Sequence, residues 1–186
     1  NHKEYFDDAM DQVKKFQNEG KTRFIGLSDW SSKKIMSFIK ICDPDVVQPY
    51  RNVMDDTYVS TGLKNYVDKN NLGVCFFSPI KHGLLTGKYL KPATFKDGDF
   101  RQNDPAFANK LILEKMRGNK EALKDRFPNH SHYVMHGVVN ALFSDSPTAC
   151  VLLGQRNVAQ VEVAATLGNL LSDEDTAWIK RLYKVE

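Results

Sequence analysis

The segment from Val74 to Tyr89 joins a buried strand to a glycine-bearing loop, a combination that favours a ligand site. Its first part, Val74–Phe77, is a continuous apolar run without polar alternation, which is typical of a parallel strand covered on both faces. Ser78-Pro79 ends the strand because proline cannot donate a hydrogen bond to a sheet. Gly83 and Gly87 follow in the loop. Since α/β folds bind ligands where parallel strands end and loops begin, we expect a site here.

The chain also holds residue types that bind metals elsewhere. His132 and His136 have the four-residue spacing of a helical metal pair. They lack the glutamate of a His-Glu-x-x-His motif, so we interpret them as solvent or packing histidines. Cys42, Cys75 and Cys150 form no Cys-x-x-Cys pair, and two of them lie in apolar, strand-like runs. We expect reduced, buried cysteines and predict no metal site.

Composition narrows the class of protein. The 186 residues suffice for one ordinary domain, and 41% hydrophobic with 26% charged residues is a normal globular balance. A net charge of +3 is too small to indicate a nucleic-acid partner. No apolar run reaches the roughly 18 residues that a membrane span needs, and the polar start at Asn1 shows no signal peptide. We therefore expect a cytoplasmic protein with neither a nucleic-acid nor a membrane partner.

Helical and strand-like patterns alternate along one domain, residues 1–186. We expect strands at 23–28, 45–50, 73–78 and 149–154, and helices at 5–18, 31–42, 60–70, 131–143 and 157–167, with a last helix capped by Ser172. A long loop or insert spans 91–130. Its polar first part, Lys91–Asp104, is expected to be functional. A helix begins at Pro105, runs through Leu113 and reaches Phe127 if Gly118 does not interrupt it.

This alternation predicts an α/β fold with right-handed parallel crossovers. Four strands are too few for a complete doubly wound sheet. A (β/α)8 barrel takes ~250 residues and twice as many strands. The chain therefore supplies about half of the strands of such a barrel.

Five segments, in order and at matching spacing, resemble the aldo-keto reductases over almost the whole chain. They are Glu19–Asp29, Val47–Asn52, Phe76–Tyr89, Gly98–Arg101 and Leu153–Gln160. They resemble the regions of the fifth, sixth and seventh barrel strands, a Gly-Asp-x-Arg loop, and the eighth strand with its exit. The resemblance implies the (β/α)8 TIM-barrel fold, present here as a partial barrel of about four parallel strands with helices.

The resemblance also implies a site for a nicotinamide cofactor. Its residues would be Ser28, Asp29 and Gln48 at the nicotinamide carboxamide, Phe77 stacked on the ring, Ser78, Ile80, Gly83 and Leu84 along the pyrophosphate, and Gly154, Gln155, Arg156 and Gln160 around the adenosine. Two positions depart from the family. Asp29 replaces the usual asparagine, and Val163-Ala164 replaces a Glu-Asn pair that holds the adenine. Ser28 and Gln48 are alternatively strand-end caps, and Phe77 is alternatively a core residue.

Catalytic residues are absent from the matched segments. In the family a tyrosine acid, a lysine, an aspartate and a histidine come from the first four strands, and this chain begins at the helix after the fourth. His2 falls near the place of that histidine, but no apolar strand precedes it. Because hydride transfer to a carbonyl needs a proton donor near the forming alkoxide, we expect the chain alone to be inactive.

The resemblance implies an oxidoreductase that reduces an aldehyde or ketone with NADPH, in preference to NADH. Two alternatives stay open. The first is a non-catalytic binding or regulatory subunit of aldo-keto-reductase type. The second is a half-barrel that pairs with itself or with a separate N-terminal half, since four parallel strands leave two bare edges.

Overall fold

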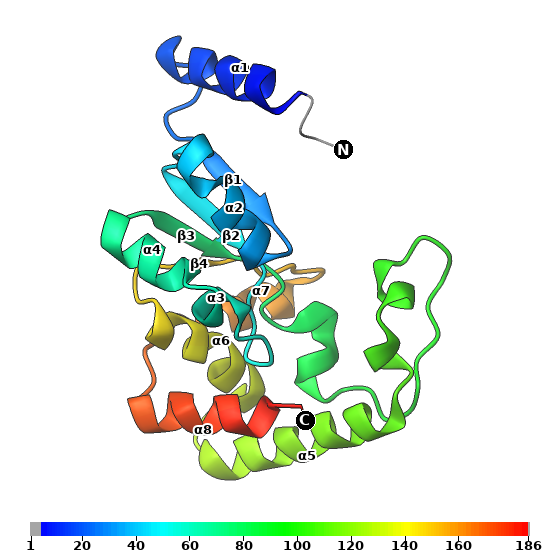
Figure 1. Ribbon diagram of the computed structural model, residues 1–186. Coiled ribbons are helices and arrows are strands. Elements are labelled where there is room, and N and C mark those ends of the chain that lie inside the picture. The colour runs from blue at the N-terminus through cyan, green and yellow to red at the C-terminus, as the bar shows by residue number, and fades with distance from the viewer. Residues whose placement is uncertain (1–4, 186) are drawn as a thin grey trace. The chain divides into compact units, whose positions relative to one another are not determined.

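The computed structural model describes residues 5–185, which form two compact units (Figure 1). The first unit comprises the described residues up to Tyr50 together with Asp56–Phe76. The second comprises Arg51–Asp55 and the chain from Phe77 onward. His2 lies outside the described residues.

The first unit alternates helices with three short strands. In chain order its elements are α1 (Phe6–Asn18), β1 (Gly26–Asp29), α2 (Ser32–Cys42), β2 (Val46–Pro49), α3 (Thr57–Ser60), α4 (Leu63–Asn70) and β3 (Gly73–Phe76). The strands β1, β2 and β3 pair in parallel, as the alternation predicts. Their register places Ser28 beside Gln48, so the carboxyl ends of β1 and β2 meet at one edge.

Local chemistry fixes the ends of these elements. The Ser31 hydroxyl accepts a hydrogen bond from the Lys34 N–H, which caps α2 at its predicted start. The predicted helix 60–70 is divided into α3 and α4, because Gly62 adopts φ +81° and interrupts the helical backbone. A single helix over 60–70 was therefore a wrong prediction.

The second unit is mainly helical. Its elements are the 3₁₀ turns η1 (Lys81–Thr86), η2 (Phe100–Asn103) and η3 (Pro105–Phe107), the helices α5 (Lys110–Arg126), α6 (Tyr133–Asp145), α7 (Val158–Ala165) and α8 (Asp173–Tyr183), and the strand β4 (Cys150–Val151). The segment 91–130 thus contains α5, which continues through Gly118 without a break. At two residues, β4 is shorter than the predicted 149–154.

The helices of this unit enclose an apolar core. Fully buried side chains come from η1, α5, α6 and α8, and include Leu84, Met116, Leu142 and Ile179. The buried Tyr183 hydroxyl donates to the Leu85 carbonyl at 2.9 Å, and burial raises the pKa of this phenol. Helix α8 is thereby fastened to η1.

The cysteines differ from the prediction in their burial. None of the three forms a disulfide, but only Cys42 is buried, while Cys75 is half-buried and Cys150 is exposed. Within residues 5–185, no helix combines the length and apolar character of a membrane span.

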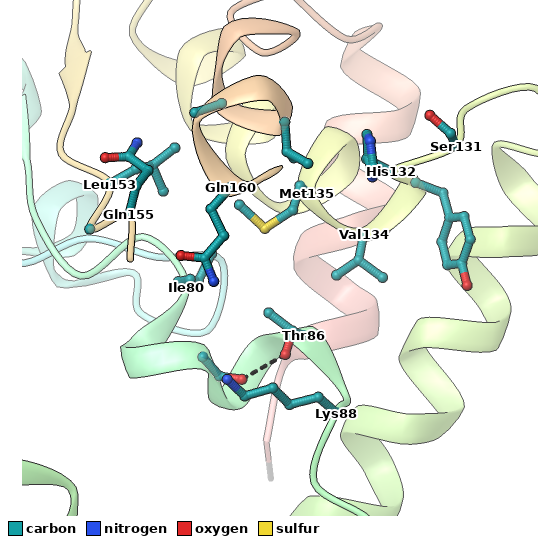
Figure 2. A pocket seen from close by; sticks show the side chains of 15 residues that line it. Ile80, Thr86, Lys88, Ser131, His132, Val134, Met135, Leu153, Gln155 and Gln160 are labelled. Atoms are coloured by element: carbon teal, nitrogen blue, oxygen red, sulfur yellow. Dashed lines mark hydrogen bonds between the residues drawn. The ribbon is translucent and has the colours of Figure 1, made fainter. Parts of the chain in front are cut away.

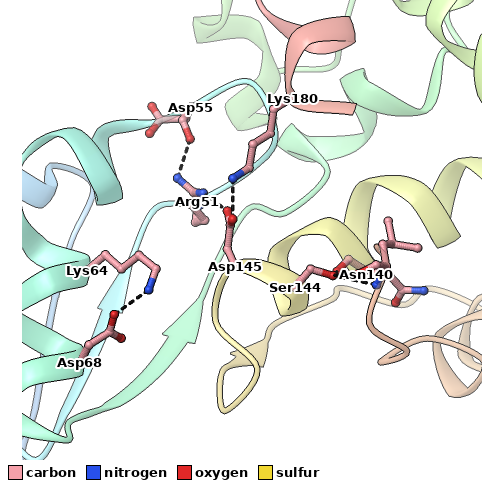
Figure 3. Close-up of polar contacts among 9 residues, drawn as sticks. Arg51, Asp55, Lys64, Asp68, Asn140, Ser144, Asp145 and Lys180 are labelled. Carbon is pink, nitrogen blue, oxygen red and sulfur yellow. Dashed lines mark hydrogen bonds and ion pairs between the residues drawn. The ribbon is translucent and has the colours of Figure 1, made fainter. Parts of the chain in front are cut away.

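An ion pair with a buried arginine stabilises the second unit (Figure 3). The Arg51 side chain is 1% exposed, and its guanidinium contacts the Asp145 carboxylate at 2.5 Å. Lys180 of α8 reaches the other carboxylate oxygen of Asp145. The Arg51 guanidinium also donates to the Asp55 carbonyl at 3.1 Å. Asp145 therefore neutralises a charge that has little access to water.

We expect Asp145→Ala to lower the free energy of unfolding by about 3 kcal/mol, because it leaves the Arg51 charge buried without its carboxylate. The matched control is Asp68→Ala, which breaks the more exposed Lys64–Asp68 pair on α4 and should cost about 0.5 kcal/mol or less. Urea unfolding of both variants measures the difference. Equal losses would contradict the role assigned to burial.

Candidate functional site

The chain after β3 follows an unusual backbone path. Ser78, Lys81 and His82 have φ angles of 57°, 45° and 54°, and Gly83 has φ 90°. A left-handed conformation costs a non-glycine residue about 1–2 kcal/mol. Such strain persists only where surrounding contacts enforce it, and it concentrates at functional sites.

Contacts within the second unit hold this path. The Lys81 ammonium lies 3.0 Å from the Asp104 carboxylate, and the Thr86 hydroxyl donates to the Gly83 carbonyl at 2.8 Å. Gly87 ends η1 with φ 64°. A Cβ there would lie 2.6 Å from the Met116 carbonyl oxygen, so only glycine allows the loop to lie this close to α5.

The loop forms one wall of a cavity of about 670 Å³, which we call the polar cavity. Its opposite wall is the segment that follows β4. The residues that line it are Phe77, Ser78, Pro79, Ile80, His82, Gly83, Lys88, Asp99, Phe100, Arg101, Leu152, Leu153, Gly154, Gln155, Arg156 and Gln160.

Three cations line the polar cavity with one carboxylate, so its net charge is positive. Arg101 is bound to Asp99, whose oxygens accept from the guanidinium, and Arg101 also donates to the Tyr89 hydroxyl at 3.1 Å. These bonds to Arg101 lower the pKa of Asp99 to about 2. Lys88 has no carboxylate partner among residues 5–185; its ammonium lies over the Tyr89 ring. The polar cavity therefore suits an anionic ligand.

His82 is the titratable group in this wall that changes charge nearest neutral pH. Its ring lies 5.2 Å from the Phe100 ring. Burial lowers the pKa of His82, an effect that the Asp104 carboxylate opposes. At neutral pH the His82 ring is accordingly uncharged, and the positive charge of the cavity comes from its lysine and arginines.

The segment after β4 is ordered by the start of α7. The Asn157 side chain caps this helix by accepting from the Gln160 N–H. The Gln160 side-chain oxygen in turn accepts from the Arg156 N–H at 2.7 Å. The amide oxygen of Gln160 is thereby fixed, and its NH₂ group is left to face the cavity.

A second cavity of about 410 Å³ adjoins the first, and we call it the apolar cavity (Figure 2). It shares Ile80, Gly83, Lys88, Leu153, Gly154, Gln155 and Gln160 with the polar cavity. The remaining lining consists of Thr86 from η1, the segment 131–135 around the start of α6, and Val163-Ala164 of α7. Figure 2 shows Gln160 and Met135 opposite Thr86 and Lys88 across this space.

The predicted residues of the first unit meet at the carboxyl ends of β1 and β2. The Ser28 hydroxyl donates to the Gln48 carbonyl at 2.9 Å, while the Gln48 side-chain amide has no partner among the described residues. Asp29 accepts from the Ser31 N–H and contacts the Lys34 ammonium at 2.9 Å. The hydrogen bond to Lys34 contributes most to lowering the pKa of Asp29. The Asp29 carboxylate thus stabilises the start of α2, and its cofactor role stays a prediction.

The structure brings most of the predicted second-unit residues together. Phe77, Ser78, Ile80, Gly83, Gly154, Gln155, Arg156 and Gln160 all line the polar cavity. The Leu84 side chain lines neither cavity, because it is fully buried in the core.

Sequence reasoning missed Lys88 and Arg101 as site residues. Both lie inside motifs that carried the resemblance, Phe76–Tyr89 and Gly98–Arg101. For Lys88, which directly follows Gly87, a cation after the glycine of a loop was the available signal. The contribution of residues 131–135 had no signal in the local sequence.

The second-unit residues fit the phosphates of a dinucleotide cofactor. Gly83 leaves the space that a Cβ would fill, 3.1 Å from the Lys88 ammonium. Lys88 and Arg156 offer positive charge without a close carboxylate partner among residues 5–185. Small residues beside such cations allow phosphate oxygens to approach the backbone.

Comparisons with known proteins identify the family and the fold. The sequence profile described as the aldo/keto reductase family matches residues 1–184. The glycerol dehydrogenase AKR11B4 of Gluconobacter oxydans is 27% identical and superposes with a TM-score of 0.77, over 95% of this chain and 53% of that protein. The predicted resemblance and fold class are thus confirmed: the fold is α/β, with four strands and helices that form part of a (β/α)8 barrel.

Two of the curated relatives are named aldo-keto reductases, and a third is named a probable potassium channel subunit. Aldo-keto reductase YhdN of Bacillus subtilis is 25% identical over 91% of this chain and 51% of its own length. Aldo-keto reductase yakc [NADP(+)] of Schizosaccharomyces pombe is 30% identical over 58% of this chain and 32% of its own length. A probable voltage-gated potassium channel subunit beta of Arabidopsis thaliana is 27% identical over 58% of this chain and 35% of its own length. The chain spans about half of these relatives' length, or less.

We expect Gly83→Ala to lower the free energy of unfolding by about 1 kcal/mol, because alanine is strained at φ 90°. The flexible Lys88 ammonium can move away from the new methyl group, so the backbone term dominates. Gly154→Ala is the control: a Cβ there meets nothing within 4 Å, and we expect no loss of stability. Urea unfolding checks both, and a neutral Gly83→Ala would show that the loop relaxes freely.

Proposed function

The chain belongs to the aldo/keto reductase family, and we propose that it carries the cofactor-binding part of an NADPH-dependent enzyme that reduces an aldehyde or ketone. When bound, the reduced nicotinamide ring supplies the hydride for such a reduction. The residues of this chain bind and orient the cofactor.

The observation that carries the proposal is the polar cavity. It gathers most of the second-unit residues that the resemblance implies, beside Lys88, Arg101 and Arg156. A pyrophosphate is anionic, and arginine and lysine are the side chains that bind it best. The glycine at position 83 supports close approach of the backbone to its oxygens.

The preference for NADPH over NADH rests on the number of cations. Lys88 and Arg101 lie on one wall of the polar cavity, and Arg156 lies on the other, after β4. Two cations suffice for the pyrophosphate, so the third is available for a 2′-phosphate. The yeast relative whose name includes NADP(+) supports this assignment.

The first unit offers hydrogen-bonding groups for the nicotinamide carboxamide. The Gln48 side-chain amide supplies both a donor and an acceptor, and the Ser28 hydroxyl retains accepting capacity beside it. We propose that these two groups fix which face of the ring presents its hydride.

We assign no catalytic acid among the described residues. The proton donor would then come from a complementary part of the barrel. The exposed Gly26 and Ser28 on β1 leave one face of this strand uncovered, and we propose that a complementary half or a second copy of the chain covers it.

We expect NADPH to bind the purified chain, with Arg156→Ala weakening its binding about tenfold, or ~1.4 kcal/mol, and leaving NADH binding nearly unchanged. The reason is that a 2′-phosphate is present only in NADPH. Fluorescence titration of both cofactors measures the two affinities.

The control variant is Lys110→Ala, which removes the same charge from α5 but lines neither cavity. It should leave both affinities unchanged. Failure of NADPH to bind the unmodified chain would contradict the proposed cofactor site. An equal loss for both cofactors would assign Arg156 to the pyrophosphate.

A second candidate function is that of a non-catalytic binding or regulatory subunit. The observation that favours it is the Arabidopsis thaliana relative, whose name describes a potassium channel subunit. Such a protein would bind the cofactor in the same cavities without reducing a carbonyl compound.

We expect a hybrid of this chain with the N-terminal half of the Bacillus subtilis relative to reduce aldehydes with NADPH, whereas the chain alone should not. The hybrid supplies the proton donor that hydride transfer requires. A hybrid that binds NADPH but reduces none of a panel of aldehydes and ketones would favour the regulatory subunit. Light scattering of the chain alone shows whether it pairs with itself, and a monomer would argue against pairing.

A further inference from the structure

Two side chains of α6 bind the chain that follows α7. The Asn140 side-chain oxygen accepts from the Gly168 N–H at 2.9 Å. One turn later on α6, the Ser144 hydroxyl accepts from the Leu171 N–H at 2.8 Å (Figure 3). Gly168 follows closely on α7, and this helix forms part of the wall of the apolar cavity. The two bonds therefore hold the end of α7 against α6.

The position of Asn140 determines the protonation state of His136. Because the Asn140 oxygen faces the Gly168 N–H, its NH₂ group faces Nδ1 of His136, at 3.0 Å. An NH₂ group can only donate, so Nδ1 of His136 accepts and carries no proton. The ring is accordingly neutral, with its proton on Nε2. Asn140 is fully buried and His136 is 9% exposed, so water is no ready substitute for either partner.

A proton on Nδ1 of His136 conflicts with the two bonds of Asn140. With the amide as it stands, two donors face each other, and the bond between the side chains is lost. Rotation of the amide by half a turn presents its oxygen to the charged ring, which makes a stronger bond than a neutral pair. The NH₂ group then faces the Gly168 N–H, so that bond is lost instead. Either arrangement leaves a donor without an acceptor, and the second is favoured by the charge.

The surroundings of His136 disfavour a charged ring. The His130 ring is stacked on it, with the ring centroids 3.6 Å apart and an angle of 16° between the planes, and the Phe127 ring contacts it edge-on at 4.9 Å. Burial contributes most to lowering the pKa of His136, and a charge on His130 lowers it further, whereas the Asp175 carboxylate of α8 opposes both. Two charged rings in this stack would repel each other, so acid strains the contact from both sides.

The charge of Asp175 is already balanced by an arginine. Arg126, at the end of α5, contacts the Asp175 carboxylate at 2.7 Å and the Glu174 carboxylate at 2.8 Å. The other elements that pack against α6 are η1 and β4, and their titratable groups are Lys81, His82 and Cys150. Asp175 therefore offers a charged His136 only part of a counter-ion.

We propose that His136 is an acid-sensitive switch, whose protonation breaks the bond between Asn140 and Gly168 and frees the chain after α7. The neutral ring keeps this bond in place. The bond between Ser144 and Leu171 involves no titratable group and persists in acid. Loss of one of the two attachments loosens α7, and with it one wall of the apolar cavity. The switch is built from α6 and its neighbours, so it does not depend on the proposed function.

The lowered pKa of His136 fixes the direction of the effect. The folded chain binds this proton less readily than the unfolded chain does, so protonation costs folding free energy. The stabilisation is complete above the ordinary histidine pKa of about 6.5, and it is lost as the pH falls through the lower pKa of the folded state.

Hydrogen exchange followed by NMR tests the proposal at single amides, with each rate corrected for intrinsic exchange at that pH. We expect the protection factor of the Gly168 N–H to fall about fivefold or more between about pH 7.5 and about pH 5, while that of the Leu171 N–H stays within about twofold. In His136→Gln the new oxygen can accept from Asn140 without titrating, so the fall at Gly168 should disappear. The matched control is the same change at the exposed His132, which should leave the fall intact.

Three results would overturn the proposal. They are an unchanged protection factor at Gly168, an equal fall at Leu171, and a fall at Gly168 that persists in His136→Gln. If this variant does not fold, nitrogen NMR spectra of the labelled, unmodified chain decide the question. A proton on Nε2 of His136 at neutral pH supports the switch, and a proton on Nδ1 contradicts it.

Discussion

The close approach of Gly87 to helix α5 is the constraint on which the candidate site depends. A side chain at this position would overlap the Met116 carbonyl, so the loop can lie against the α5 backbone only with glycine there. The Tyr183 hydroxyl holds the same loop from α8 through the Leu85 carbonyl. These two contacts hold the C-terminal end of η1, and the Lys81–Asp104 ion pair holds its start. Lys81 and His82 are thereby kept in left-handed conformations that an isolated loop would leave. This fixed path of the loop places Ile80, Gly83 and Lys88 in the wall that lines both cavities.

The charge of the polar cavity is distributed unevenly between cations that are paired and cations that are not. Arg101 is held by Asp99 and lies over the Phe95 ring at 4.3 Å, so a ligand must compete with a carboxylate for it. Lys88 has no carboxylate partner within residues 5–185 that it would have to release. In the proposed cofactor site, a phosphate would bind Lys88 at little cost, whereas recruitment of Arg101 would cost part of its interaction with Asp99. The proposal therefore assigns the larger share of initial binding to Lys88 and an orienting role to Arg101.

Local patterns allowed much of the fold to be predicted, and packing between distant segments limited the rest. The helix from Ser32 to Cys42 followed from its cap and its apolar spacing, and both ends matched. Gly62 divides the predicted helix 60–70 because its backbone is left-handed. The sequence does not distinguish such a glycine from one that a helix tolerates, such as Gly118. The strand after Ala149 reads as a buried run, but most of that segment is irregular. Most cavity-lining residues inside contiguous motifs were predicted, although Lys88 and Arg101 were missed. The contribution of Met135 depends on how α6 packs and left no local trace.

If the cavities of the second unit hold the cofactor as proposed, they contribute to binding and not to the chemical step. The same cavities would then serve a reductase and a non-catalytic subunit alike. A phosphate-binding wall needs cations and small residues, which Gly83 and Lys88 provide irrespective of any later reaction. Reduction of a carbonyl needs in addition a proton donor placed at the developing oxyanion, and that donor contributes nothing to holding the phosphates. Loss or gain of the donor can therefore change the activity without changing this cavity. In the proposed enzyme, the residues described here would bind the cofactor, and the part of the barrel that faces the carbonyl would decide whether the bound cofactor reacts.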